Sequence, residues 1–265
     1  MADLGVVPTE APVRADLMRT AHKIWVEAVR RYHRLEITTP DLPIDEPVLF
    51  VANHGFGGVF DLNVFAAYAA FNDLALDRPV TALTHQIAWT VGAGQLLESV
   101  GSRPASRESA LAAFDAGHHV LVLPGGDVDA AKSFTDRNTI VFSGRRGFAS
   151  LATDAGVPIV PVVTAGAGES LLVLNDGQRL ARALRLDSLL RVKALPVSIS
   201  APWGLTIGAG AVLPYLGLPT KLRTTVLAPM WPRTDESTRE FGDRVEEAMQ
   251  AAMTAMTAGR RPIIG

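Results

Sequence analysis

The chain has 265 residues, of which 48% are hydrophobic and 20% are charged, and its formal net charge is −2. This composition is typical of a globular protein long enough to bury a core, and the small net charge excludes a strong electrostatic attraction to nucleic acid. The chain contains no cysteine, which excludes disulfides, thiolate metal sites and a cysteine nucleophile.

The N-terminal residues form an extended leader that carries acids and prolines. They lack the order of a signal peptide, in which basic residues precede an apolar run, so we expect a cytoplasmic protein. From Asp16 onward an amphipathic helix is predicted. Its apolar face is expected to consist of Leu17, Ala21, Ile24, Trp25, Ala28 and Tyr32. The cations around this face allow two interpretations, a helix packed on the protein or a helix lying on anionic lipid.

Strand and helix patterns alternate from residue 48 to residue 166. Val48 to Ala52 is a continuous apolar run, typical of a strand buried on both faces. Further strands are expected at 80–83, 118–126 and 157–166, and helices at 61–71, 86–100, 106–116 and 147–155. This order predicts an α/β fold with a mostly parallel central sheet flanked by helices.

The C-terminal third adds two predicted strands, "LPVSIS" and "TTVLAPM", and a final helix capped by Thr234, Asp235 or Ser237. We find no repeat and no flexible linker. Residues 1–45 are therefore assigned to the leader and first helix, and residues 46–265 to a single domain.

The stretch 194–220 contains no charged residue and is long enough to cross a bilayer. Prolines and glycines interrupt it throughout, and lipid offers no partner for the hydrogen bonds that interior prolines remove. We therefore expect strands and loops here, which either belong to the core or face lipid.

Three predicted strand ends carry polar residues suited to chemistry: "ANHGFGGVFD", "LPGGDVD" and "VVTAGAGES". Ligands of open α/β sheets gather where such ends converge. Histidine is the side chain that ordinarily changes charge near neutral pH, and Asp61 can hold the imidazole of His54 in one tautomer. Such a pair suits removal of a proton from a hydroxyl that attacks a carbonyl. The alternative is structural: His54 is only hydrogen-bonded after its strand, and Asp61 is only the N-cap of the next helix.

Other classes of site fit the sequence less well. A serine hydrolase needs a G-x-S-x-G string, which does not occur. No metal site is expected, because His118 and His119 are adjacent and point to opposite faces of a strand. A nucleotide-binding oxidoreductase needs G-x-G-x-x-G after an early strand, and the chain has "GAGQLL" and "GAGAVL" in other contexts.

Four stretches, in order, resemble the blocks of the glycerolipid acyltransferase superfamily, which includes lysophosphatidic acid and diacylglycerol acyltransferases. Asn53, His54 and Asp61 match the first block, and Gly101 and Arg107 match the second. The third block is matched by "VLVLPGGDVD" and the fourth by "GVPIVPVV". The resemblance covers residues 46–232, and it implies a fold like that of glycerol-3-phosphate acyltransferase.

The third and fourth blocks are more similar to the diacylglycerol acyltransferase branch. That branch has a basic-glycine-phenylalanine helix start, a glycine-glutamate pair after the valine-proline strand, and a proline-glycine-glycine turn. "GRRGF", Gly168-Glu169 and Pro124-Gly125-Gly126 with Asp129 follow this pattern. The chain departs from the wider family by a longer spacing between His54 and Asp61 and by glycine in place of the third block's glutamate.

The resemblance implies transfer of a fatty acyl group from acyl-CoA, a co-substrate, to a hydroxyl of a lysophospholipid, diacylglycerol or related lipid, with no other cofactor. His54 would be the general base, oriented by Asp61. Taken with the resemblance, the following residues are expected to bind substrate, phosphate or the oxyanion: Asn53, Arg103, Arg107, Pro124, Gly125, Gly126, Arg145 and Arg146. The alternative for the arginines is a solvated basic face.

The same resemblance gives the 194–220 stretch two further roles, lining the acyl tunnel or contacting the membrane that carries the acceptor. The protein would then be peripheral on the inner face of the membrane. The main alternative to an enzyme is a non-catalytic lipid-binding relative with the same fold.

Overall fold

The computed structural model describes residues 20, 24, 26–40, 44–56, 61–84, 98, 101–186, 193–208 and 216–265. The predicted leader over residues 1–15, the loop at 57–60 and, apart from Glu98, the predicted helix at 86–100 lie outside the described residues.

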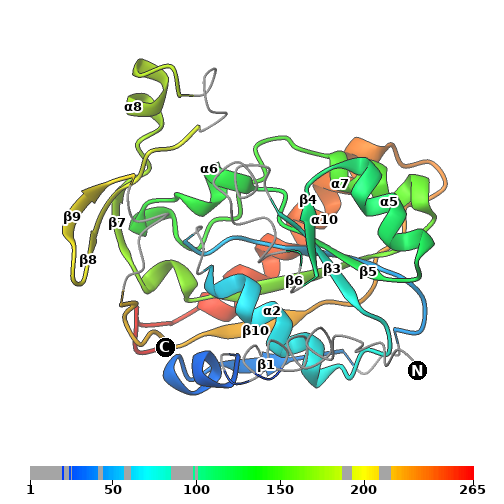
Figure 1. The fold of residues 1–265 in the computed structure, drawn as a ribbon, viewed down its shortest axis with the longest axis horizontal. Coiled ribbons are helices and arrows are strands. Elements are labelled where there is room, and N and C mark those ends of the chain that lie inside the picture. The colour runs from blue at the N-terminus through cyan, green and yellow to red at the C-terminus, as the bar shows by residue number, and fades with distance from the viewer. Residues whose placement is uncertain are drawn as a thin grey trace, which may run out of the picture.

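A seven-stranded sheet forms the centre of the fold, in the order β1-β10-β6-β2-β5-β3-β4 (Figure 1). Strands β6, β2, β5, β3 and β4 are parallel, and β10 runs antiparallel to β6. The strands are β1 (Glu36–Thr38), β2 (Leu49–Ala52), β3 (Val80–Thr84), β4 (Ser102–Pro104), β5 (His119–Val122), β6 (Ile159–Ala165) and β10 (Arg223–Val226). The prediction of a mostly parallel sheet in an α/β domain is confirmed.

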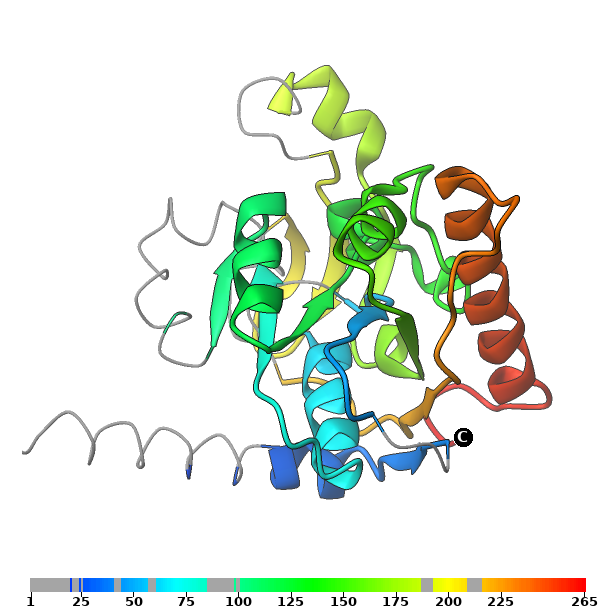
Figure 2. The same cartoon turned by 90° about the vertical axis from the view of Figure 1, so that its right-hand side faces the viewer.

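Helices cover both faces of this sheet, which explains why its central strands are apolar on both sides. On one face lie α5 (Arg107–Asp115), α7 (Gly147–Ala155) and α10 (Thr238–Thr257), and α10 runs along one flank of the domain (Figure 2). On the other face lies α2 (Leu62–Asp73). Along β2, Leu49 packs in the first layer and Phe50 in the second, as the two-residue period of a strand requires.

The helix ends agree with local capping chemistry. Of the three candidates for the last helix, Ser237 is the N-cap, and it forms a capping box with Glu240. Helix α7 has the bounds that the sequence predicts and ends at Gly156, which has a φ of 65°. The remaining short helices are α6 (Gly126–Ala130), η1 (Phe134–Asp136), η2 (Ala167–Glu169) and α8 (Gln178–Ala183).

A second, three-stranded antiparallel sheet projects from the domain beside α8 (Figure 1). It consists of β7 (Leu172–Asn175), β8 (Val197–Ser200) and β9 (Gly204–Ile207). Within the described part of the 194–220 stretch, the large apolar side chains of β8 and β9 are exposed. The interpretation of that part as plain core is therefore wrong. No helix among the described residues is long and apolar enough to cross a membrane.

Of the face predicted for the N-terminal helix, Leu17, Ala21 and Trp25 lie outside the described residues. The described part of the helix packs through a different face from the one predicted. Val26, Val29 and His33 are buried, whereas Ile24 and Tyr32 are exposed. Both sets have helical spacing, so periodicity within the helix cannot choose between them. The choice is tertiary, because Val29 packs against Ala167 and Leu222 of the domain.

The adjacent histidines at the start of β5 serve the core separately. His118 hydrogen-bonds Thr81 through Nδ1 at 3.0 Å, while His119 is completely buried and accepts the Val48 N–H at Nδ1. His118 lies directly before β5, and His119 is its first residue. Burial, aided by the charges of Arg78 and His118, lowers the pKa of His119 to about 4.

This shift predicts a pH dependence of folding. Because the pKa of His119 in the folded state is below the ordinary 6.5, its contribution to stability is complete above pH 6.5 and is lost as the pH falls toward 4. The loss should amount to about 3 kcal/mol in the free energy of unfolding. Urea denaturation from neutral to mildly acidic pH measures it.

His119→Asn retains an acceptor for the Val48 N–H and removes the titration. Its free energy of unfolding should fall less steeply with pH than that of the wild type over the same range. Parallel pH curves for the two proteins would contradict this account.

Candidate active site

The three polar strand ends meet at one edge of the central sheet. Strand β2 is parallel to β5 on one side and to β6 on the other. The loops that follow these strands are therefore neighbours, as the sequence predicts. His54 lies two residues beyond β2, at the centre of this edge.

His54 and Asp61 are brought together despite their longer spacing. Nδ1 of His54 and Oδ2 of Asp61 are 2.5 Å apart, and the two side chains are 17% and 5% exposed. The other carboxylate oxygen of Asp61 accepts the N–H of Asn63 and caps α2. Asp61 thus fills both roles that the sequence suggested, partner of the imidazole and helix cap. Among the described residues, Nε2 of His54 has no hydrogen-bond partner.

Asn53 ties the site loop to the neighbouring strand. Its amide donates to the carbonyl of Thr164 at 3.1 Å, and its carbonyl oxygen accepts the Thr164 N–H at 2.9 Å. The side chain of Asn63 donates to the backbone carbonyl of Asn53 at 2.6 Å. Because Asn53 is 1% exposed, it positions the site loop from the buried side of that loop.

Asp129 holds the site loop from the third block. This completely buried carboxylate accepts the His54 N–H at 2.8 Å and the Val141 N–H at 3.0 Å. It also pairs with Lys132 at 2.7 Å, and Lys132 donates to the backbone carbonyl of His54. The backbone on both sides of the imidazole is therefore fixed by a buried ion pair.

The glycine that replaces glutamate in the third block is required by this packing. A Cβ at Gly125 would lie 2.1 Å from the Cβ of Asp129. Gly125, the N-cap of α6, thus lies so close to Asp129 one turn later that no side chain fits there, which accounts for the departure from the wider family.

The two arginines before α7 hold the protein together in different ways. Arg145 donates to the carbonyls of Pro124 and Gly125 at 3.1 and 2.5 Å and so clasps the third-block turn. Arg146 pairs with Asp243 and Glu246 of α10. Both guanidinium groups are engaged within the protein, and a phosphate at Arg146 would have to displace two carboxylates.

The other two predicted arginines lie away from the imidazole. β4, which carries Arg103 and is followed by Arg107, is three strands from β2, and three strand spacings amount to about 14 Å. Arg107 is 55% exposed and pairs with Asp154 at 2.6 Å, an ion pair that lowers the pKa of Asp154. Arg103 bonds the carbonyl of Ser102. These contacts favour the solvated basic face for both residues.

In the pair Gly168-Glu169, the glutamate forms a buried ion pair with the C-terminal segment. Glu169 pairs with Arg260 at 2.8 Å, with both side chains at most 2% exposed, and it also accepts the N–H of Ile263. Although burial alone raises the pKa of Glu169, these hydrogen bonds hold it below its ordinary value. The pair thus fastens the C-terminal segment to η2.

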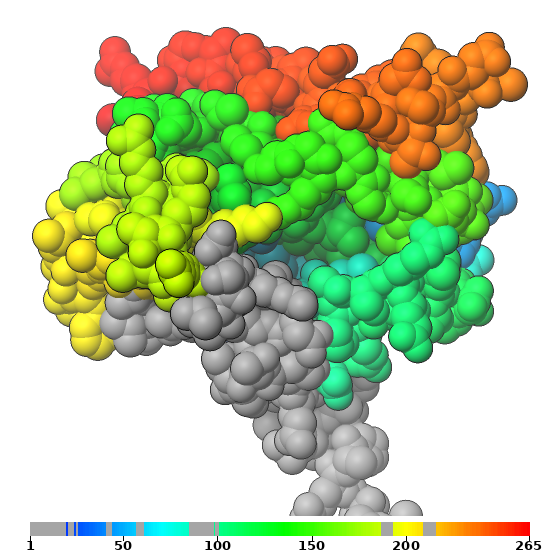
Figure 3. Space-filling model, turned by 90° about the horizontal axis from the view of Figure 1, so that it is seen from above, coloured from blue at the N-terminus to red at the C-terminus, as the bar shows by residue number. Residues whose placement is uncertain are grey.

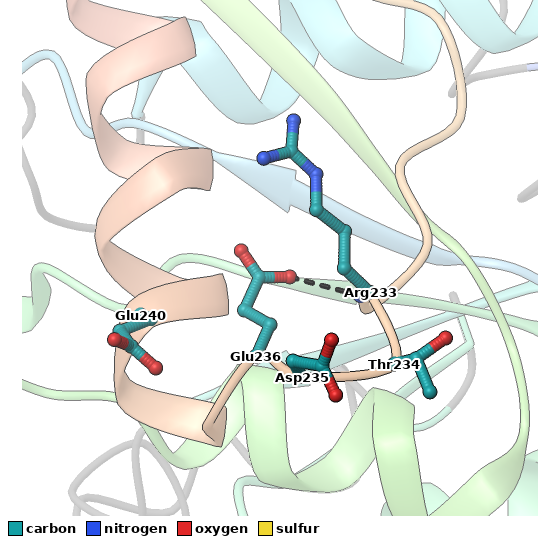
Figure 4. Close-up of a pocket in the computed structure, with 5 residues that line it drawn as sticks. All are labelled: Arg233, Thr234, Asp235, Glu236 and Glu240. Carbon is teal, nitrogen blue, oxygen red and sulfur yellow. Dashed lines mark hydrogen bonds between the residues drawn. The ribbon is translucent and has the colours of Figure 1, made fainter.

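A surface depression of about 540 Å³ lies at the start of α10, lined by Arg233, Thr234, Asp235, Glu236 and Glu240 (Figure 4). Glu236 accepts the N–H of Arg233 and is bonded by Arg244, whose contact lowers the pKa of Glu236 to about 2. Glu240 belongs to the capping box of α10, and no histidine is among the described residues that line the depression, so we place the candidate site at His54.

A family model described as Acyltransferase matches residues 17–165, which is more than half of the chain. The chain belongs to the acyltransferase family. The resemblance inferred from the four sequence blocks is confirmed. Within this acyltransferase-family chain, the match includes all four blocks and the His54–Asp61 pair.

Two curated relatives span most of the chain. An uncharacterized protein of Mycobacterium tuberculosis is 28% identical over 273 residues, covering 93% of this chain and 66% of that protein. The human DGAT1/2-independent enzyme synthesizing storage lipids is 28% identical over 234 residues, covering 88% of this chain and 65% of that enzyme. The chain thus spans slightly less than two thirds of the length of these relatives.

A solved structure shares the fold of this acyltransferase-family chain. The crystal structure of the 1-acyl-sn-glycerophosphate (LPA) acyltransferase PlsC from Thermotoga maritima superposes with a TM-score of 0.51 at 15% sequence identity. The match covers 93% of this chain and 87% of that one.

Sequence reasoning missed the supporting residues of the site. Lys132 and Asn63 were not among the predicted residues, and Asp129 was noted only as part of the third block. The available signal in the sequence was that Asp129 and Lys132, of opposite charge, are three residues apart and follow the glycine turn. It did not show that the pair is buried beneath His54.

The ion pair beneath the site predicts a test of stability. Asp129→Asn should lower the free energy of unfolding by about 3 kcal/mol or more, because it leaves Lys132, 6% exposed, as an uncompensated buried charge. The double variant Asp129→Asn with Lys132→Met should lose less than the sum of the single variants. Urea denaturation measures all three.

Asp73→Asn is the matched control, since Asp73 pairs with Arg30 at a half-exposed position. Its cost should be about 1 kcal/mol or less. Strict additivity of the Asp129 and Lys132 variants would show that the two side chains do not act as a pair.

Proposed function

We propose that this chain transfers a fatty acyl group from acyl-CoA to a hydroxyl of a glycerolipid acceptor, such as a lysophospholipid or diacylglycerol, with His54 as general base. The observation that carries the proposal is the contact of 2.5 Å between His54 Nδ1 and Asp61 Oδ2. It leaves Nε2 as the nitrogen that can take a proton. Membership of the acyltransferase family and the names of the human relative and of PlsC support the reaction class.

The reaction proceeds by one addition and one elimination. Nε2 of His54 takes the hydroxyl proton as the oxygen attacks the thioester carbonyl, and Asp61 stabilises the imidazolium that forms. Collapse of the tetrahedral intermediate breaks the carbon–sulfur bond, and His54 returns the proton to the thiolate of CoA. The net products are the ester and free CoA.

The third-block turn is the candidate for stabilising the oxyanion of the intermediate. The Gly126 N–H already donates to the carbonyl of Leu123 at 3.3 Å. No bond to the Gly125 N–H is found among the described residues, so we assign the donor role to Gly125. Arg145 supports the turn by binding its carbonyls.

The proposal includes a peripheral place on the inner face of a membrane, where the acceptor lipid resides. The fixed backbone on both sides of His54 supports an enzyme, because a base must be held in place to be effective. A non-catalytic lipid-binding relative has no need of an imidazole paired in this way.

Thiol release from acyl-CoA in the presence of a panel of hydroxyl acceptors tests the function. His54→Gln should lower kcat/KM by about 10²–10⁴-fold, because the base is lost. Asp61→Asn should lower it by about 10²-fold or more, because the imidazole loses the partner that fixes its tautomer.

His118→Gln is the matched control, since His118 bonds Thr81 within the sheet and should retain wild-type turnover. Thermal unfolding checks that each variant is folded. A folded His54→Gln protein with full turnover would refute the mechanism, and a wild-type protein that binds acyl-CoA without releasing thiol would favour the non-catalytic alternative.

A further inference from the structure

The projecting three-stranded sheet has an inverted polarity pattern. Pairing places Ile199 opposite Leu205 on one face and Ser198 opposite Thr206 on the other. Leu205 is 65% exposed, Ile207 56% and Ile199 44%, whereas Ser198 is completely buried. An antiparallel sheet that faces water normally turns its polar side chains outward. The outer face of this sheet is instead suited to an apolar environment.

The apolar surface continues beyond the sheet. Leu216 is 69% exposed, and its N–H bonds the carbonyl of Ala201 next to β8. Leu218, 45% exposed, follows, and the intervening Gly217 accepts a hydrogen bond from Tyr32 of the N-terminal helix at 2.8 Å. We call residues 172–186, 193–208 and 216–218 the projecting unit.

The charges of the projecting unit favour an anionic partner. Arg179 and Arg182 of α8 are exposed, next to the exposed Leu180 and Leu184. Its described residues contain one carboxylate, Asp176, which accepts the backbone N–H and the side-chain amide of Gln178. Exposed apolar side chains beside arginines match the boundary between acyl chains and anionic headgroups.

The projecting unit is attached to both loops of the candidate site. Phe56, two residues after His54, packs in one buried cluster with Leu171 and Val173 of the β7 segment. The N–H of Lys193 bonds the carboxylate of Asp127 in α6. A surface bound by this unit therefore lies close to the loops that carry the imidazole and the third block.

We propose that the projecting unit docks on an anionic lipid bilayer, with Ile199, Leu205, Ile207 and Leu216 inserted among the acyl chains. The proposal rests on the proposed function in one respect, that the acceptor reaches His54 from this bilayer. Pairing with the same unit of a second copy fits less well, because the described residues of that unit would bring the same arginines and no exposed carboxylate to complement them.

Flotation of the full chain with vesicles of phosphatidylcholine, with and without phosphatidylglycerol, tests the docking. Leu205→Thr with Ile207→Thr keeps residues that favour strands and removes apolar area, and it should weaken binding to the mixed vesicles by about tenfold or more. Leu216→Asp is a second variant outside the hairpin and should have a similar effect.

Trp231→Thr and Trp231→Asp are the controls. Trp231 is 50% exposed and belongs to the segment before α10. The orange surface of that segment lies at the opposite end of the molecule from the yellow surface of the projecting unit (Figure 3). Both control variants should bind vesicles like the wild type. Equal losses in control and test variants, or no binding by the wild type, would overturn the proposal.

The cationic part of the surface has its own test. Arg179→Gln with Arg182→Gln should weaken binding to the vesicles that contain phosphatidylglycerol by about tenfold and leave binding to pure phosphatidylcholine unchanged. Arg233→Gln with Arg239→Gln, exposed at the start of α10, should change neither. If the wild type forms a dimer and does not bind vesicles, and the Leu205 and Ile207 variant is a monomer, the surface belongs to a contact with a second copy and the proposal is overturned.

Activity distinguishes failure of the docking from failure of the proposed function. The Leu205 and Ile207 variant should retain thiol release with a dissolved short-chain acceptor and lose it with an acceptor embedded in vesicles. If no protein releases thiol but the flotation pattern holds, docking stands and the transferase assignment fails. Equal activity of this variant and the wild type on the embedded acceptor would overturn the docking surface.

Discussion

Asp129 is the contact on which the geometry of the candidate site depends. It is completely buried where the loop after β2, the turn after β5 and the segment at Val141 meet. Its carboxylate accepts the N–H of His54 in that loop and the N–H of Val141 in that segment. Lys132 supplies the opposite charge and reaches the backbone carbonyl of His54. A buried carboxylate needs such partners, since desolvation without them is too unfavourable. The attraction between Asp129 and Lys132 and the hydrogen bonds with the backbone at His54 and Val141 offset the cost of burying the pair.

This arrangement also explains two departures from the wider family. The longer loop between His54 and Asp61 still closes to 2.5 Å, because Asp61 is fixed independently as the N-cap of α2. Glycine replaces the third block's glutamate because the turn lies against Asp129. At this position the chain therefore has a close packing contact with Asp129 and no carboxylate.

The arginines of the described residues differ in whether they bind groups within the protein or are exposed to solvent. Arg145, Arg146 and Arg260 all bind groups within the protein, as buried or half-buried guanidinium groups do when planar oxygen partners are near. Arg179 and Arg182, which no motif singled out, are exposed beside an apolar surface. Among the described residues, these two arginines combine exposure to solvent with exposed apolar neighbours, Leu180 and Leu184.

The amino-acid order was sufficient for the central strands of the main sheet, for the helices α2, α5, α7 and α10, and for the edge where the site loops converge. It did not predict β1, β4, β7 and β9 or the second sheet. Periodicity placed β2, α7 and α10, and the rule for parallel strands brought the loops at His54, Gly125 and Gly166 together, because these depend on local spacing and on chain topology. The partners of the arginines, the buried face of the N-terminal helix and the place of Asp129 depended on tertiary packing. In each case several residues have a similar local sequence pattern, and contacts with residues distant in the chain determine which of them is buried or bonded. A local pattern does not contain the information on which distant residue is near.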